Sequence, residues 1–371
     1  MRVLMISKAC VVGIYQRKLE EIARLGVDLT VVVPPSWHDE RGEVPLERAH
    51  TQNYRLVVNP IRFNGSFHLH YYPGLKRWFS PRPDIVHIDE EPYNLATWQA
   101  LRLARQAGAK ALFFSWQNIR RPYPLPFALG EAWVLRHIDQ AIVGTESAAA
   151  VWRAKGYRGP LAVIPQFGVD PELFRPPTKP IAGRTRTLGY VGRLVPEKGV
   201  EVLLRALDRL LLSGVNNWRL DVVGGGPQRR ALERLSAELG LSERVSFLGQ
   251  LPSMQMPAFY RQLDVLLMPS LTRRNWKEQF GRVLVEAMAC GVVPIGSDSG
   301  AIPEVIGEAG LIVPEGDVTG LAHTLRRLLL DDELRQELGR RGRQRVLAHY
   351  TQQQVAERTV AVYRAMLGKE G

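Results

Sequence analysis

Two glutamates, Glu278 and Glu286, lie in a segment whose pattern predicts a site for a phosphorylated ligand that carries hydroxyl groups. The segment reads PSLTRRNWKEQFGRVLVEAMACG and covers residues 269–291. A strand-like run ends there and a helical pattern begins near Gly281. The backbone N–H groups of residues 279–283 would then form a helix N-terminus, which attracts anions such as phosphate. Because ionised carboxylates accept strong hydrogen bonds, the two glutamates would bind hydroxyl groups beside that phosphate.

The spacing of the two glutamates separates their expected roles. Glu286 follows Glu278 by eight residues, which is roughly 80° beyond two full helical turns. The two carboxylates therefore need not share a face, and we expect them to contact different parts of one elongated ligand. The spacing alone also fits a glutamate that caps a helix followed by one on its surface.

A second candidate segment, GYVGRLVPEKG at residues 189–199, joins a strand pattern to a helix pattern through a basic loop. Gly192 would let the backbone approach a ligand closely. Arg193 offers a planar fork of donors and Lys198 a point charge, and together they could neutralise a diphosphate. Many surface loops carry arginine and lysine, so an ordinary surface loop is the alternative.

Apolar runs alternate with helical patterns in both halves of the chain, which predicts parallel sheets crossed by helices. Strands are expected at residues 3–7, 29–33, 85–88, 111–115, 141–144, 161–164, 187–191, 220–223, 245–248, 265–268, 293–297 and 311–313. Helices are expected at residues 16–25, 95–108, 199–212, 227–239, 254–262, 282–289, 303–306, 318–330 and 351–367.

This order predicts an α/β protein of two Rossmann-like, doubly wound lobes that face each other across a cleft. The first lobe would cover residues 1–170, and the second residues 186–350, with a proline-rich linker at 171–185. The last helix, 351–367, could pack back on the first lobe. Ligands of such sheets usually bind at the carboxyl ends of the strands.

The formal net charge of +12 is shared equally by residues 1–170 and 171–371. Because no basic arm or tail gathers the excess, nucleic acid is not an expected partner. A diffuse positive field suits anionic small molecules or an anionic membrane surface. The arginine-rich run at 340–345 is interpreted as the solvated face of a helix.

Neither the cysteines nor the termini suggest export or metal binding. Cys10 and Cys290 stand in apolar contexts, and we interpret both as reduced core thiols. The histidines show no metal-ligand spacing, so no metal is expected. The N-terminus lacks a signal-like apolar region, and no run approaches the roughly 18 to 20 apolar residues of a membrane span. We therefore expect a cytoplasmic protein, which could work at the inner face of the membrane.

Several segments resemble, in the family's order, those of the retaining family-4 glycosyltransferases of GT-B fold. EQFGRVLVEAMACG is similar to the E-x7-E signature of that family, and GYVGRLVPEKG, DVVGGGP, VSFLGQL, DVLLMPS, SDSGAIPEVI and EAGLIVPEGD resemble its other motifs. In the first half, PDIVHIDE and VIPQFGVDPELF are also similar to the family. The likeness spans nearly the whole chain and is most specific in residues 187–317.

The resemblance implies a hexosyltransferase of polysaccharide biosynthesis whose donor is a UDP-, GDP- or ADP-sugar, with no metal or further cofactor. The acceptor would be a glycan, a lipid-linked molecule or a small molecule. Arg193 and Lys198 would bind the diphosphate, Glu286 the ribose hydroxyls and Glu278 the transferred sugar, so that Glu278, Arg193 and Lys198 form the catalytic set. The implied donor site comprises Gly13, Gly192, Arg193, Lys198, Gln250, Leu251, Glu278, Gln279, Phe280, Gly281, Arg282, Val283 and Glu286.

One departure from the family lies on the acceptor side. Many relatives place a histidine where this chain has Gln117 and Asn118, and neither amide can act as a general base. His87 is interpreted as a hydrogen-bonded histidine at a strand end. The loop from Asn118 through Arg120 and Arg121 would border the acceptor and could touch a lipid, although a rigid proline connector is an equal alternative.

Three other classes of protein fit parts of the pattern. A nucleotide-sugar epimerase of the same architecture would need an acid and a base across the cleft, and no convincing pair is present. A Rossmann dehydrogenase would need G-x-G-x-x-G after the first strand, where SKACVVGIY holds one glycine. A non-catalytic sugar-binding protein would normally be exported, and no signal is expected.

Overall fold

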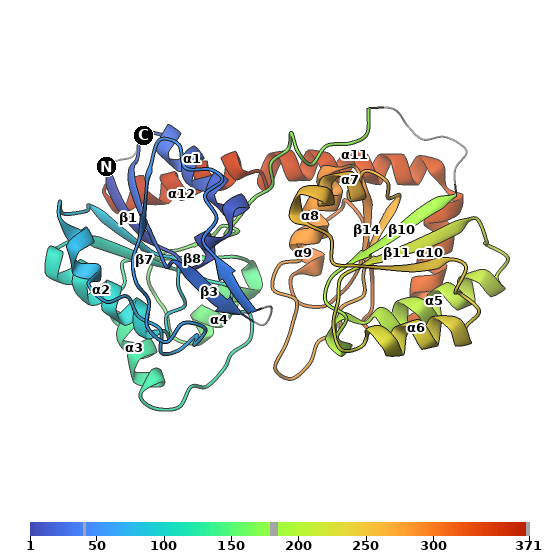
Figure 1. The fold of residues 1–371 in the computed structure, drawn as a ribbon, viewed down its shortest axis with the longest axis horizontal. Coiled ribbons are helices and arrows are strands. Elements are labelled where there is room, and N and C mark those ends of the chain that lie inside the picture. Colours follow the sequence, from blue (N-terminus) through green and yellow to red (C-terminus); the bar gives the residue numbers. More distant parts are fainter. Residues whose placement is uncertain (40–41, 179–184, 369–371) are drawn as a thin grey trace. The chain divides into compact units, whose positions relative to one another are not determined.

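A computed structural model describes residues 1–39, 42–178 and 185–368 of the chain. It divides into two compact units (Figure 1). Unit 1 consists of Met1–Gly168 together with Gln352–Gly371, and unit 2 of Val169–Thr351. Unit 1 thus takes up the C-terminal helix of the chain. Each unit is a separate α/β body.

Unit 1 is built on a parallel sheet of seven described strands in the order β5-β2-β1-β6-β7-β8-β9. The strands are β1 Arg2–Ile6, β2 Asp28–Val33, β5 Arg55–Val58, β6 Ile85–Ile88, β7 Lys110–Ser115, β8 Gln140–Val143 and β9 Leu161–Val163. The helices are α1 Arg17–Arg24, α2 Leu95–Ala107, α3 Phe127–His137, α4 Glu146–Ala154 and α12 Gln352–Met366.

Helices cover both faces of this sheet, which is why its strands are continuous apolar runs. One buried cluster joins the sheet to α2, α3 and α4, and a second joins it to α1 and α12. Figure 1 shows α12 beside α1, far from it in sequence. The Tyr363 hydroxyl of α12 lies 2.6 Å from His87 Nδ1 of β6, so the last helix is also tied to the sheet by a polar contact.

Unit 2 repeats this architecture with six described parallel strands in the order β12-β11-β10-β13-β14-β15. The strands are β10 Arg186–Val191, β11 Trp218–Val223, β12 Val245–Gly249, β13 Val265–Met268, β14 Val293–Ser297 and β15 Leu311–Val313. The helices are α5 Val200–Leu212, α6 Arg229–Glu238, α7 Met256–Tyr260, α8 Arg282–Ala289, α9 Ile302–Ile306, α10 Val318–Leu330 and α11 Asp332–His349. The doubly wound α/β architecture predicted from the sequence is confirmed in each unit.

The structure contains elements that the sequence patterns did not single out. Strands β3 Ser36–Asp39 and β4 Gly42–Pro45 form a small antiparallel hairpin, and the four-residue strand β5 extends the edge of the unit 1 sheet. Helix α11 was missed because its contact with α8 is made through glycines: a Cβ on Gly342 would come within 3.2 Å of Met288. A helix that packs through glycine shows only a thin apolar stripe.

The predicted linker at 171–185 begins inside unit 2, because that unit starts at Val169. The guanidinium of Arg343 on α11 donates to the carbonyl oxygens of Phe174 at 2.6 Å and Pro171 at 3.0 Å. The start of the segment is therefore anchored to α11. Residues 179–184 lie outside the described part of the chain.

The interpretation of residues 340–345 as a solvated helix face is wrong for half of its arginines. Arg340 and Arg341 are exposed and pair with Glu337. Arg343 also donates to the Ala289 carbonyl at 2.9 Å, and Arg345 donates to the carbonyl oxygens of α9 residues. Carbonyl groups at helix ends lack intrahelical partners, so these two arginines fasten α11 to α8 and α9.

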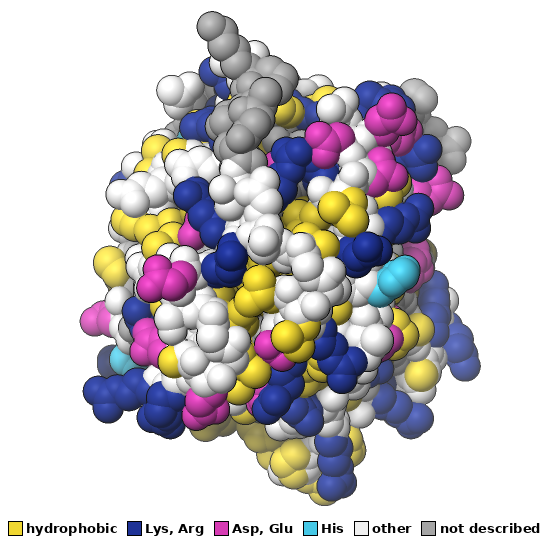
Figure 2. Space-filling view, turned by 90° about the vertical axis from the view of Figure 1, so that its right-hand side faces the viewer, with side chains coloured by type: hydrophobic (Ala, Val, Ile, Leu, Met, Phe, Trp, Pro, Cys, Tyr) yellow, Lys and Arg dark blue, Asp and Glu magenta, His cyan; other side chains and the backbone are white. Residues whose placement is uncertain are grey.

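The surface and the thiols agree with the composition. On the face of unit 2 that Figure 2 shows, basic side chains are interspersed with acidic and apolar ones. Cys10 and Cys290 are buried free thiols, and burial raises the pKa of each to about 12. Within the described residues, no helix is both long and apolar enough to cross a membrane.

Candidate active site

Two loops of unit 2 meet at the carboxyl edge of its sheet. Strands β10 and β13 are parallel neighbours, so the loops that follow them leave the sheet side by side. The first runs from Gly192 into the short 3₁₀ turn Pro196–Lys198, and the second from Pro269 to Gly281. A backbone hydrogen bond from Leu271 N to Glu197 O, 2.8 Å long, joins them.

An ion pair connects the same two loops through their side chains. Lys198 Nζ lies 2.6 Å from Glu278 Oε2, and both side chains are mostly buried. The Ser270 hydroxyl donates to the same carboxylate oxygen at 3.3 Å. The ammonium of Lys198 also lies 4.8 Å from the centre of the Trp276 ring, within range of a cation–π contact. The loop thus gives Glu278 a fixed cationic partner.

Two glycines allow the backbone around Glu278 to close tightly. Gly281 begins α8 with φ of +76°, a conformation that residues with a side chain rarely adopt. Gly300, with φ of +56°, lies so close to Glu278 that a Cβ would come within 2.1 Å of its carbonyl oxygen. That carbonyl accepts a hydrogen bond from the N–H of Ala301 at 3.1 Å, which fixes the approach to α8.

Glu286 lies inside α8 and has two partners. Its Oε1 lies 2.8 Å from Nε of Arg282, one turn earlier on the same helix. Its Oε2 accepts a 2.8 Å hydrogen bond from the hydroxyl of Tyr260, the last residue of α7. Burial, and then the nearby charge of Glu286, raise the pKa of Tyr260 well above its usual value, so the hydroxyl keeps its proton.

A pocket of about 290 Å³ opens between these loops and the start of α8. It is lined by Val191, Gly192, Arg193, Lys198, Met268, Trp276, Lys277, Glu278, Gln279, Gly281, Arg282 and Val283. Four of these side chains are cationic and one is a carboxylate. The pocket therefore joins positive charge, a helix N-terminus and an acceptor of hydroxyl groups, which suits a phosphorylated ligand with hydroxyls.

Most of the donor-site residues predicted in unit 2 come together in this pocket, and four stand outside its lining. The ring centroids of Phe280 and Tyr350 lie 5.8 Å apart. Glu286 pairs with Arg282, whose side chain lines the pocket. Gln250 and Leu251 follow β12 at the same edge of the sheet. The Gln250 side chain lies near Gly225, at the end of the neighbouring strand β11.

Gly13, the predicted donor-side residue of the first lobe, belongs to unit 1 and packs closely against Glu47 and Ala49. Its N–H donates to Glu47 Oε2 at 2.7 Å, and a Cβ there would lie 2.8 Å from both Glu47 and Ala49. The glycine is explained by this close contact within unit 1.

The structure also brings in residues that sequence reasoning missed. Trp276 and Lys277 precede Glu278 and line the pocket. Ser270 and Tyr260 support the two glutamates from outside the lining. An aromatic residue inside a basic loop could have pointed to Trp276. Nothing in the sequence marks Tyr260, because its contact depends on how α7 packs against α8.

The carboxyl edge of the unit 1 sheet holds a second group of charged residues. Glu91, just after β6, accepts hydrogen bonds from the Ser115 hydroxyl at 2.5 Å and the Trp116 N–H at 2.9 Å. Burial raises the pKa of Glu91 to about 7 despite these donors. Lys155 pairs with Glu131 at 2.6 Å. These groups connect β6 to β7 and α3 to α4.

The predicted acceptor-side residues divide by exposure. Gln117 and Asn118 are buried, and Gln117 Oε1 lies 3.3 Å from Lys155 Nζ. Arg120 and Arg121 are exposed. His87 lies within β6, not at its end, and its Nε2 has no hydrogen-bond partner among the described residues. Burial lowers its pKa well below the usual value, so this imidazole is neutral.

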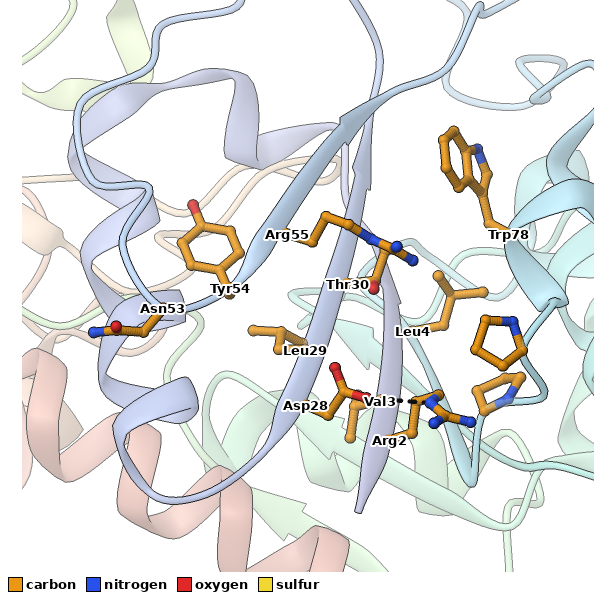
Figure 3. Close-up of a pocket in the computed structure, with 12 residues that line it drawn as sticks. Arg2, Val3, Leu4, Asp28, Leu29, Thr30, Asn53, Tyr54, Arg55 and Trp78 are labelled. Carbon is orange, nitrogen blue, oxygen red and sulfur yellow. Dashed lines mark hydrogen bonds and ion pairs between the residues drawn. The ribbon is translucent and has the colours of Figure 1, made fainter.

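A pocket of about 410 Å³ in unit 1 lies at the opposite edge of its sheet, where the strands begin (Figure 3). Arg2 and Asp28 form an ion pair of 3.2 Å along one side, and the side chains of Arg55 and Trp78 lie at the other. Ligands of doubly wound sheets bind at the carboxyl edge. This pocket is therefore not part of the candidate site. Among the described residues, no three His, Cys, Asp or Glu side chains gather as metal ligands.

Comparisons with known proteins agree with this architecture. Residues 14–166 match the model of the glycosyl transferase 4-like domain, and residues 174–345 match that of the glycosyl transferases group 1. A solved protein from Anabaena, Alr3699/HepE in complex with UDP, superposes with a TM-score of 0.73 at 18% identity. That comparison covers 98% of this chain and all of the other.

Two curated relatives are similar in sequence. The GDP-mannose-dependent alpha-(1-6)-phosphatidylinositol monomannoside mannosyltransferase of Mycolicibacterium smegmatis is 33% identical, over 65% of this chain and 66% of its own length. The D-inositol 3-phosphate glycosyltransferase of Stackebrandtia nassauensis is 30% identical, over 80% of this chain and 68% of its own length. The aligned regions thus span about two thirds of each relative. The chain belongs to the family-4 glycosyltransferases of GT-B fold.

Proposed function

We propose that the chain is a retaining glycosyltransferase that moves a hexose from a nucleoside-diphosphate sugar to a hydroxyl of a glycan, lipid-linked or small-molecule acceptor. The observation that carries this proposal is the unit 2 pocket, in which Arg193, Lys198 and Arg282 surround the N-terminus of α8 beside Glu278. The mannosyltransferase relative is named as GDP-mannose-dependent, and the Anabaena structure holds UDP. Both names support a nucleotide donor.

The groups in the pocket would act mainly by positioning and by stabilising charge. The bond between the sugar carbon and the β-phosphate oxygen breaks, and its electron pair stays on the diphosphate. Arg193, Lys198 and the α8 amides would hold that developing charge. The acceptor oxygen bonds to the same carbon on the same face, and its proton passes to a phosphate oxygen of the leaving diphosphate. Glu278 would orient the sugar by accepting hydrogen bonds from its hydroxyls.

The partners of unit 1 would include an anionic membrane surface. Five large apolar side chains, which we call the apolar rim, are 44% to 71% exposed on the segments 62–69 and 120–129. They are Phe63, Phe67, Leu69, Leu125 and Leu129. The two segments lie together, because the His68 ring contacts Tyr123 and Phe127 at centroid distances of 5.6 and 4.9 Å.

The charge around the apolar rim fits the same partner. Arg62, Arg120 and Arg121 are exposed on these two segments, which contain no aspartate or glutamate. Exposed apolar side chains beside basic ones are typical of surfaces that bind anionic lipids. The rim would hold unit 1 at the inner face of a membrane, where a lipid-linked acceptor is found.

Nucleotide binding is the first test of the proposed function. We expect one of UDP, GDP or ADP at about 100 times its Kd to raise the melting temperature by roughly 5 °C, since binding to the native state adds about 2.7 kcal/mol. A thermal-shift screen measures this, with the three free nucleosides as the comparison. If none of the three diphosphates shifts the transition, the donor assignment is wrong.

Glu278 should control turnover. We expect Glu278→Gln to lower kcat by about 100-fold or more with a smaller change in KM. The reason is that a neutral amide cannot replace the carboxylate as a negatively charged hydrogen-bond acceptor. Initial rates with the identified donor measure the effect. Glu201→Gln is the matched control, because Glu201 is an exposed carboxylate of the neighbouring helix α5, paired with Arg205. Near-normal turnover in Glu278→Gln would refute the role.

Metal should not be needed, because cationic side chains already face the proposed diphosphate position. We expect the initial rate to remain unchanged after dialysis against a chelator. The measurement compares chelated enzyme with the same enzyme after Mg²⁺ or Mn²⁺ is added back. A loss of activity that either ion restores would show that a metal takes part in the reaction.

Removing charge beside the apolar rim should weaken membrane binding. Two arginines contribute about 2 kcal/mol at an anionic surface, so the double change Arg120→Ala and Arg121→Ala should reduce partitioning by on the order of tenfold or more. Co-sedimentation with vesicles of phosphatidylcholine and phosphatidylglycerol measures it. The control removes the same charge from α2, where Arg102 and Arg105 are exposed. Equal binding by the two variants would contradict the proposal that the apolar rim and its neighbouring arginines bind the membrane.

A further inference from the structure

Arg282 stands between the pocket and Glu286. The two residues are one helical turn apart on α8, and Arg282 Nε lies 2.8 Å from Glu286 Oε1. The Arg282 side chain is 35% exposed and lines the pocket, whereas that of Glu286 is 5% exposed and does not. The guanidinium therefore covers the carboxylate on the side from which a ligand would approach.

The other side of the carboxylate is fixed. Glu286 Oε2 accepts the hydrogen bond of the Tyr260 hydroxyl, which is fully buried and donates at 2.8 Å. Because Tyr260 is embedded between α7 and α8, it cannot give way to a ligand without disturbing the core. The exposed arginine is the partner that can leave. A hydroxyl pair that approaches Glu286 from the pocket must compete with the guanidinium for Oε1.

A phosphate would give the guanidinium a new partner. Arg282 is the first residue of α8, where the free N–H groups of the helix gather, and Arg193 and Lys198 line the same pocket. Guanidinium groups bind phosphate, like carboxylate, through two parallel hydrogen bonds. Moving Arg282 from Glu286 to a phosphate therefore exchanges one anionic partner for another. Without phosphate, the movement breaks the ion pair with Glu286 and gains no phosphate contact in return.

We infer that Arg282 is a specificity residue that keeps Glu286 covered until a ligand supplies phosphate, so that the site selects nucleoside diphosphates over free nucleosides. This inference rests on the proposed function, in which Glu286 holds the ribose hydroxyls. Arg282 has two roles in it. It competes with the ribose for Glu286, and it binds the diphosphate once it has moved. The two roles predict opposite effects on two ligands.

The experiment measures binding of a nucleoside diphosphate and of the matching free nucleoside to the full chain and to Arg282→Ala. The base is the one that gives the largest thermal shift with wild-type protein. Titration calorimetry suits the diphosphate, and ligand-observed NMR suits the weaker nucleoside. We expect Arg282→Ala to bind the diphosphate about tenfold more weakly, since a charge-assisted contact is lost. It should bind the nucleoside about two- to fivefold more tightly, since the competing ion pair is gone.

Arg193→Ala is the matched control. Arg193 lines the same pocket and forms an ion pair of 3.8 Å with Glu197, whereas the ion pair of Glu286 is with Arg282. Its removal should weaken binding of the diphosphate by a similar factor and leave the affinity for the nucleoside unchanged. If Arg282→Ala binds the nucleoside more weakly than wild type or equally well, Arg282 does not compete with the ligand for Glu286, and the inference is overturned.

Two further measurements separate this inference from the proposed function. If wild-type protein binds no nucleoside diphosphate, the proposed function fails, and the inference fails with it. If Glu286→Gln binds the nucleoside as well as wild type does, the ribose contact is wrong and the inference is overturned, while diphosphate binding by wild type still supports the proposed function. Thermal melting of each variant confirms that losses of affinity come from folded protein.

Discussion

The ion pair between Lys198 and Glu278 determines how the two loops of the candidate site meet. Each residue follows a different strand, and the strands β10 and β13 are neighbours in the sheet. The pair is mostly buried, so removing either member would leave a charge with poor solvation. Because the pair is supported by the backbone hydrogen bond from Leu271 to Glu197, the loops are held by both side chains and backbone. The start of α8, and with it the pocket, depends on this junction.

Both glutamates of the site already have cationic partners. Glu278 is paired with Lys198 and Glu286 with Arg282. A sugar nucleotide carries both kinds of group that this arrangement needs: phosphates that can take over the cations, and hydroxyls that can take over the carboxylates. Binding would then be an exchange of partners in which no buried charge is left alone. A ligand with only one kind of group would leave either a cation or a carboxylate unsatisfied, which is costly in a partly buried site. Under the proposed function, selectivity for the whole donor would follow from that balance.

The sequence was informative where a local pattern determines the structure. Strands such as β10 and β13 are short apolar runs that follow and precede clear turn residues, and the segment 269–291 predicts the loop and the start of α8 from its own residues. The position of Glu278 beside the helix start follows from the same segment. These features depend on neighbours in the chain, so periodicity and glycine positions are sufficient to find them.

The features that could not be predicted depend on packing between distant segments. Tyr260 reaches Glu286 only because α7 packs against α8. Arg343 contacts Phe174 and Pro171, from which it is separated by 169 and 172 residues in the chain. An arginine-rich run does not reveal which of its members face solvent. The pairing of Arg282 with Glu286 is different, since residues four apart share a helix face. That contact was within reach of the sequence, and its consequence for access to the carboxylate required the structure.

The carboxyl edge of unit 1 bears on the question of where the acceptor proton goes. Gln117 and Asn118 stand where the family resemblance places a histidine. The Gln117 oxygen lies near the Lys155 ammonium, and an amide offers no base. Glu91 has a pKa of about 7 because it is buried, but its two oxygens accept hydrogen bonds from Ser115 and Trp116. A carboxylate held in this way by the end of the next strand serves to join β6 to β7. Both groups have structural roles within unit 1, and the proposal that a phosphate oxygen of the donor takes the acceptor proton requires no base from this unit.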